Sequence, residues 1–239
     1  MMTPRPHART RRSAALLMLA AAGLFSLAGC DPRTLFYFLQ PNEPTISAPG
    51  PKLDGKKVVV VAHAVSNALG EFQALDREVT REVVSILRAK VKKIDVVDPD
   101  KVWTWVEAHP HWTDPGEVAK AFEADVVLFL EIEGFQLQQP GDLNVYQGTS
   151  KTHLVATEMA HPKNSRGKPI LDQPKEAKTI YDDYQDTEFP VRGPIPMDTG
   201  TSRGAFKARF LKVVCAEMSW HFVGHSPDDM IQDVKFNYR

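Results

Sequence analysis

The sequence predicts an α/β protein, with α+β as the alternative: a mixed sheet of about five strands, with two long helices and one or two short ones packed on it. Three observations support this. Short apolar runs alternate with segments of helical periodicity through residues 56–132, which favours strands joined by crossover helices. Residues 143–159 alternate loosely between apolar and polar, as a half-buried strand does. Residues 202–223 then carry an apolar helical pattern that predicts a second long helix.

The first predicted unit is a strand, a long helix and a second strand. Residues 58–62 are four valines and an alanine, and such a continuous β-branched run predicts a strand buried on both faces. Residues 68–91 predict an amphipathic helix, and residues 94–97 a short strand. The apolar positions of that helix recur at spacings of three and four: Phe72, Leu75, Val79, Val83, Ile86 and Leu87.

Two short helices are predicted next, each from a start signal. Asp98 followed by Pro99 offers an N-cap with proline at the first helical position. Trp103 and Val106 are expected to face inward from this helix.

The second start signal is Asp114-Pro115, with Glu117 placed to complete a capping box. Residues 126–132 then form the most apolar run of the chain outside the leader, and they predict a buried strand. The expected apolar stripe of the short helix is Val118, Ala121 and Phe122.

The remaining chain is less regular. Gly148, inside the segment 143–159, is interpreted as a bulge or a turn. Residues 177–184 predict an edge strand. The connections on either side, residues 160–175 and 190–204, are rich in proline and glycine and predict irregular structure.

The amino terminus has the three parts of an export signal. Four arginines (Arg5, Arg9, Arg11 and Arg12) precede an apolar run over residues 14–28, and small residues follow it. A membrane-spanning helix would need about 20 apolar residues, and this run is shorter. We therefore expect residues 1–29 to be a signal peptide, cut between Gly29 and Cys30.

The stretch Leu27-Ala28-Gly29-Cys30 resembles the lipobox of bacterial lipoproteins. The resemblance implies a diacylglyceryl group on the Cys30 sulfur and cleavage after Gly29. It also implies a membrane anchor through that lipid, in the inner or outer membrane of a bacterial envelope and facing the periplasm. The alternative is an ordinary secreted protein in which Cys30 has no special role.

The segment after the cysteine predicts a tether. Residues 30–55 are rich in proline and glycine, which favours extended, semi-stiff chain. The exception is the apolar run over residues 35–39, whose aromatic side chains lie in lipid headgroups on one interpretation and pack on the folded body on the other. Residues 56–239 are expected to form a single α/β domain.

The charge composition limits the kinds of partner that the protein can bind. The leader holds four arginines and no acidic residue, so its removal changes the formal net charge from −1 to −5. An acidic surface argues against a nucleic-acid partner, which needs basic patches. The second cysteine, Cys215, lies in the apolar helical pattern and is expected to be a small buried side chain rather than a reactive thiol.

A further resemblance covers about a third of the chain, residues 56–133. A valine-rich strand, a long amphipathic helix, a short strand, a helix and then Ala124-Asp125 opening an apolar strand are similar to the amino-terminal domain of TolB and to the curli-export lipoprotein (CsgG) class. The resemblance implies a module that builds envelope assemblies and binds proteins, without enzymatic activity. Glu131 and Glu133 depart from the pattern, because those families often carry small or neutral residues there.

Candidate chemical sites are few. His109 and His111 are weak candidates for a metal site, since metal ligation usually needs three or four ligands. His221 and His225 stand four residues apart and could share a helical face or cap a helix end. An acidic group that could hold calcium or form a solvated turn comprises Asp182, Asp183, Asp186 and Glu188.

No catalytic residue and no cofactor is predicted, because the nucleophile-elbow, phosphate-loop and dinucleotide-binding motifs do not occur. The leading hypothesis is a membrane-anchored, non-enzymatic scaffold or accessory subunit of an envelope assembly or transport complex, with protein partners. One alternative is an envelope hydrolase or metal-dependent enzyme that uses His109, His111 or the acidic residues. A further alternative is a carrier of a lipid or small apolar ligand, held between the sheet and the final helix.

Overall fold

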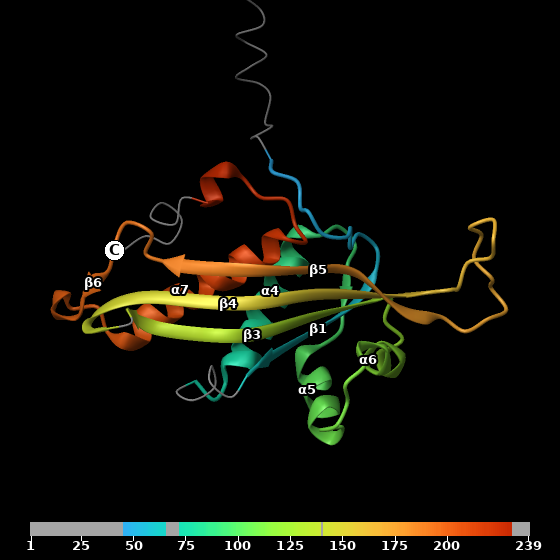
Figure 1. The fold of residues 1–239 in the computed structure, drawn as a ribbon, viewed down its shortest axis with the longest axis horizontal. Helices are drawn as coiled ribbons and strands as arrows, with labels where there is room; N and C mark the ends of the chain where they lie inside the picture. Colours follow the sequence, from blue (N-terminus) through green and yellow to red (C-terminus); the bar gives the residue numbers. More distant parts are fainter. Residues whose placement is uncertain (1–44, 66–71, 140, 231–239) are drawn as a thin grey trace, which may run out of the picture. The chain divides into compact units, whose positions relative to one another are not determined.

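The computed structural model describes residues 45–65, 72–139 and 141–230, which form one mixed sheet flanked by helices (Figure 1). The strands join in the order β2-β1-β3-β4-β5, and β6 also pairs with β4. β1 is parallel to β2 and to β3, whereas β4 is antiparallel to β3, β5 and β6. The predicted α/β class is confirmed. The strands are β1 (Lys57–Ala64), β2 (Asp95–Val96), β3 (Val126–Gln139), β4 (Asp142–Ala160), β5 (Glu176–Phe189) and β6 (Ile195–Pro196).

Two long and two short α-helices cover the sheet in the part of the chain that the structure describes. The long helices pack on one face, behind the strands in Figure 1, and the short ones pack on the other. Two 3₁₀ turns, Met197–Thr199 and Pro227–Met230, accompany them. The helices are α4 (Leu75–Lys90), α5 (Pro99–Ala108), α6 (Pro115–Phe122) and α7 (Arg203–Trp220).

The valine run of β1 shows why both layers are needed. Val58 and Val60 pack in the cluster beneath α4 and α7, whereas Val59 and Val61 pack in the cluster beneath α5 and α6. Successive side chains of a strand point to opposite faces, so an unbroken apolar run requires cover on both sides. The prediction of a doubly buried strand is confirmed.

The two short helices begin where the sequence predicts. The Asp98 side chain accepts a hydrogen bond from the Asp100 N–H at 3.0 Å, and a proline occupies the first turn. The Asp114 Oδ1 accepts one from the Gly116 N–H at 2.8 Å. Each aspartate satisfies a backbone donor that has no partner within the helix.

Val106, Val118 and Phe122 pack on the core as predicted, and one predicted residue of each short helix does not. In α5 the residues on the core are Val102, Trp105 and Val106, while Trp103 lies under the Arg77 guanidinium. In α6 the buried alanine is Ala119 instead of Ala121. The tertiary cluster selects which side of a short helix is covered, and the apolar pattern of a helix this short is compatible with more than one choice.

The first long helix starts later than predicted. α4 begins at Leu75, not at residue 68, and residues 68–71 of the predicted helix lie outside the described residues. Phe72 precedes the helix, and its ring packs edge-on against Phe135 at 5.3 Å between centroids. Phe72 is therefore apolar because it contacts the sheet, not because it belongs to the helical stripe.

β4 and β5 are longer than the sequence indicates because they pair with each other from Gly148–Phe189 to Ala160–Glu176. β5 is the edge strand, as predicted, and extends past Tyr184 to Phe189. Gly148 lies at a bulge, as predicted: Thr149 pairs with Gln136 and Tyr146 with Gln138, so two residues of β4 stand opposite one of β3. A Cβ there would lie 2.6 Å from the Phe210 ring, so the glycine makes room for an aromatic side chain of α7.

Part of the predicted tether packs on the body. Ile46 and His225 exchange backbone hydrogen bonds of 2.8 and 3.2 Å, and the Gly50 N–H donates to the His221 carbonyl at 2.8 Å. Leu53 is fully buried in the larger core. The tether prediction of 30–55 is thus wrong for its last residues, which bind the end of α7 by backbone pairing that no side-chain pattern reveals.

Residues 1–44 lie outside the described residues, and with them the predicted signal peptide, Cys30 and the apolar run 35–39. Among the residues that are described, no helix is both long enough and apolar enough to span a membrane.

Candidate functional site

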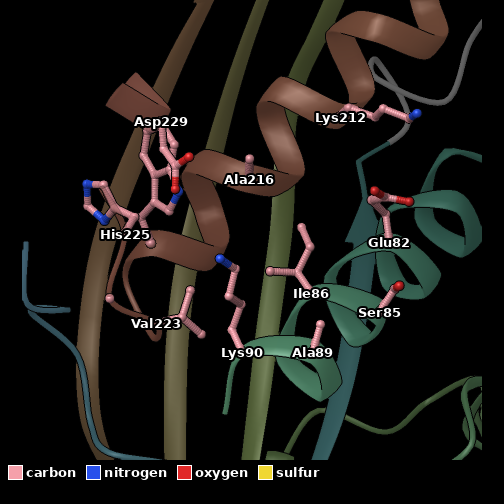
Figure 2. A pocket seen from close by; sticks show the side chains of 12 residues that line it. Glu82, Ser85, Ile86, Ala89, Lys90, Lys212, Ala216, Val223, His225 and Asp229 are labelled. Atoms are coloured by element: carbon pink, nitrogen blue, oxygen red, sulfur yellow. The ribbon is translucent and has the colours of Figure 1, made fainter. Parts of the chain in front are cut away.

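A groove runs between α4 and α7, on the side of these helices that faces away from the sheet (Figure 2). Its volume is about 310 Å³. In Figure 2 the side chains of α4 and α7 extend into the space between the two helices, and the turn after α7 closes one end. The apolar lining residues are Ile86 and Ala89 from α4, Ala216 and Trp220 from α7, and Val223 beyond it.

Small side chains explain why two packed helices leave a groove here. Ser85 and Ala89 of α4 and Ala216 of α7 are too short to fill the space between the helix backbones. Deeper in, the same helices are closely packed, since Leu87 and Val213 are fully buried. The groove is thus an opening above a complete core and not a defect within it.

Charged and aromatic groups border the groove. Glu82, Lys90 and Lys212 line it beside the apolar residues. The Trp220 ring stacks on the His225 ring with centroids 4.5 Å apart. His225 is also the residue that pairs with Ile46, so the amino-terminal segment of the body holds this end of the groove in place.

The apolar opening differs from the one expected for a ligand carrier. That hypothesis placed it between the sheet and the final helix, but Phe206, Phe210 and Val214 fill that interface. Apolar side chains on the inner face of α7 were placed correctly by their spacing. The sequence does not show that these side chains fill the whole space between α7 and the sheet, because that depends on where the sheet lies.

The two histidines proposed for metal do not form a site. The His109 ring stacks on Trp105 at 4.2 Å between centroids, and its Nδ1 is 2.8 Å from the Trp105 carbonyl oxygen. His111 is exposed. Across the described ranges, no three His, Cys, Asp or Glu side chains are arranged to hold a metal ion. The metal-dependent alternative therefore has no ligand set in this region.

His221 belongs to a polar network between α7 and β5. Its Nε2 lies 2.8 Å from Gln185 Oε1, and its Nδ1 lies 2.6 Å from the Tyr181 hydroxyl. Gln185 in turn donates to Glu217 at 3.2 Å. The histidine is at the C-terminal end of α7, as predicted, but its ring binds the strand and does not cap the helix. His225 lies in the turn beyond the helix, so the two histidines do not share a helical face.

Burial sets the protonation of this network. It lowers the pKa of His221 below the ordinary 6.5, and the charge of Asp183 offsets part of that shift. Burial also raises the pKa of the Tyr181 hydroxyl, with a further contribution from Asp183. The neutral imidazole then donates from Nε2 to Gln185, and the single proton of the Tyr181 hydroxyl is shared between His221 Nδ1 and Asp183.

We expect stability to fall as the pH drops below about 6.5, because the unfolded chain binds a proton on His221 more readily than the folded chain does. This loss of stability is absent well above pH 6.5. It grows as the pH falls, until the pH passes the lower pKa that His221 has in the folded chain. A His221→Gln variant, whose amide has no charge to gain, should lose less stability between about pH 7.5 and pH 5.5. Urea unfolding at several pH values measures this. Equal pH dependence of wild type and variant would contradict it.

The acidic residues form no calcium loop, because they are spread along the extended strand β5, with Asp183 on one face and Asp182, Asp186 and Glu188 on the other. Asp182 lies 2.7 Å from His153, on the face of α5 and α6. Asp183 accepts from the Tyr181 hydroxyl at 3.0 Å, next to His221 on the other side. A strand separates consecutive side chains, whereas a calcium site needs its oxygens to converge.

Cys215 is fully buried in α7, which confirms the sequence interpretation. Burial raises the pKa of its thiol, and the nearby carboxylates of Glu82 and Glu78 act in the same direction. A thiol held protonated in an apolar core is a poor nucleophile.

The fold and the groove define an α/β body with an apolar interhelical opening. No protein-family model and no curated protein matches the chain. Among solved structures, it is similar to the PelC dodecamer from Paraburkholderia phytofirmans, with 10% identity, 75% of this chain and 95% of that chain covered, and a TM-score of 0.40.

Two other solved structures are similar to the same extent. The hypothetical protein CT253 from Chlamydia trachomatis shows 13% identity over 70% of this chain and 97% of its own, with a TM-score of 0.39. Lipoprotein GNA1162 from Neisseria meningitidis shows 10% identity over 68% of this chain and 96% of its own, with a TM-score of 0.36. Similarities at this level assign no activity to the chain.

Proposed function

We propose that this protein is a lipid-anchored lipoprotein of the bacterial envelope and acts as a non-enzymatic scaffold or accessory subunit of an assembly or transport complex. The lipobox-like Leu27-Ala28-Gly29-Cys30 and the proline-rich segment after it support the anchor. The observation that carries the binding role is the apolar groove between α4 and α7, which lies on the outer side of the body where a partner can reach it.

The size of the groove favours a protein partner over a carried lipid. Its volume is about 310 Å³, at the lower limit of the roughly 300–1,000 Å³ typical of small-molecule sites. It is open along the helices and lined by short side chains. Such a groove accepts one or two apolar side chains from the face of a partner helix. The charges of Glu82, Lys90 and Lys212 at its border would contribute more to the orientation of that partner than to its affinity.

The groove can be blocked without disturbing the core. Ala89 is exposed on α4 and lines the groove, so Ala89→Glu adds length and charge where the partner would sit. Glutamate is a good helix former, and α4 should persist. Ala121→Glu on α6 is the matched control, since Ala121 is also an exposed helical alanine but lies on the opposite face of the sheet.

We expect crosslinking followed by a pull-down from detergent-solubilised membranes to recover the same envelope proteins with wild type and with Ala121→Glu. Ala89→Glu should reduce that recovery by about tenfold, because a buried unpaired charge opposes binding by well over 1 kcal/mol. Equal recovery with all three proteins would show that the groove is not the contact. Recovery of no partner by any of them would count against an accessory-subunit role.

A further inference from the structure

A second, larger groove lies on the opposite face of the sheet, beside the loop that joins α5 to α6. Its volume is about 610 Å³. The loop contributes Trp112 and Asp114 to one wall, and the strands form the floor. This groove is separate from the one between α4 and α7, because the sheet lies between them.

The floor carries a row of polar side chains from three neighbouring strands. His63 of β1 is in register with Glu131 of β3, and Glu131 is in register with His153 of β4. Residues in register on adjacent strands stand side by side on the same face. The row therefore crosses the groove at one level, with a carboxylate between two imidazoles.

The hydrogen bond of His153 determines what this row offers a ligand. Nε2 lies 2.7 Å from Asp182 Oδ1, and a carboxylate only accepts, so Nε2 carries the proton of this bond. In a neutral imidazole Nδ1 is then an acceptor. Nδ1 faces Glu131 Oε2 at 3.8 Å, which is too long for a hydrogen bond. Two acceptors thus border the same space, and a donor from outside could bind both.

The charges of the residues that line the groove favour a cationic donor. None of the lining residues, all of them in the described part of the chain, is Lys or Arg, and the lining carboxylates are Asp114 and Glu131. The nearby Lys151 is already paired with Glu133 at 2.8 Å. Within the described residues, no lysine side chain lines the space between Glu131 and His153.

Aromatic and aliphatic side chains make the rest of the groove apolar. The rings of Trp112 and Phe129 meet edge to face with centroids 5.8 Å apart, and Val155 continues the floor. An apolar stem can lie on these rings while its charged end reaches the polar row, and the ring faces also favour a cation.

We propose that this groove binds an organic ammonium group carried on an apolar or aromatic stem, with Glu131 and His153 accepting its hydrogen bonds. The ammonium belongs either to a small amine or to the lysine side chain of another protein, and both present the same chemistry to the groove. The binding needs neither the lipid anchor nor a partner at α4 and α7, so it can be tested separately from the proposed function.

The test uses the full-length chain labelled at the histidine Cε1 positions and titrated with phenethylammonium, followed by NMR. We expect saturable shifts at His63 and His153. Glu131→Gln should weaken binding by about tenfold or more, because a charge-assisted hydrogen bond becomes a neutral one. Glu107→Gln, at an exposed position of α5 outside the groove lining, should leave binding unchanged.

The neutral analogue 2-phenylethanol isolates the role of the charge, since it keeps the stem and a donor. Equal affinity for the alcohol and the amine, or equal affinity of wild type and Glu131→Gln for the amine, would overturn the proposal. A blocked tetrapeptide of alanine, phenylalanine, lysine and alanine identifies the source. Tighter binding of the peptide than of the free amine assigns the ammonium to a protein, and the reverse order assigns it to a small molecule.

Discussion

Replacement of Cys30 by alanine is expected to abolish incorporation of labelled palmitate into the protein, because the thioether forms only on the cysteine sulfur. The variant should also keep residues 1–29 and migrate as the larger precursor. Metabolic labelling of cells followed by immunoprecipitation measures both changes.

Cys215→Ala is the control for that experiment. The only other cysteine of the chain is buried in α7 and held as a thiol, so its loss should leave labelling and processing at the wild-type level. Labelling that survives Cys30→Ala, or a wild-type protein that takes up no lipid, would show that the lipobox resemblance is misleading.

Phe210→Ala is expected to cause a large loss of stability. Phe210 is fully buried, and its ring packs on Phe135, Phe189 and Phe206 with centroids 4.8, 6.4 and 6.4 Å away. It also fills the space that Gly148 leaves on β4. Removing such a ring destabilises by about 3–5 kcal/mol through lost burial and the cavity left behind.

That loss is a large part of the roughly 5–15 kcal/mol that holds a typical domain together. We expect Tm to fall by roughly 10 °C or more, which differential scanning calorimetry measures. Phe210→Leu retains most of the apolar surface and should lose clearly less. A loss for Phe210→Ala no greater than that of Phe210→Leu would mean that the aromatic cluster relaxes around the cavity, and that the close contact with Gly148 is not a constraint.

Much of the fold follows from local chemistry that the sequence displays. The valine run of β1 needs apolar cover on both faces, so it predicts two layers before any helix is placed. Asp98 and Asp114 accept hydrogen bonds from the first free N–H groups of their helices, and this requires only residues nearby in the chain. Cys215 was interpreted as buried for a similar reason, since its neighbours already form an apolar helical pattern.

The features that the sequence does not predict depend on contacts between distant parts of the chain. Gly148 lies at the predicted bulge, but the sequence does not show that Phe210, more than sixty residues later, packs against it. The end of the tether pairs with His225 and His221 through backbone groups, which all residues share and no pattern marks. Trp105 faces the core in place of Trp103 because α5 must meet β1 at a particular rotation.

Both grooves belong to this second category. The spacing of residues predicts that Ala89 and Ala216 lie on helices, but not that these helices pack side by side and leave a gap between them. His63, Glu131, His153 and Asp182 come from four different strands, and the sequence contains no motif that joins them. By itself the sequence determined the element types and the doubly covered sheet, because these depend on composition and short-range periodicity. The export signal and the lipid anchor are predictions from the same kind of local pattern. Only the tertiary structure decided which side chains converge, because strand register and helix packing are set by the shapes of surfaces that meet across the whole domain.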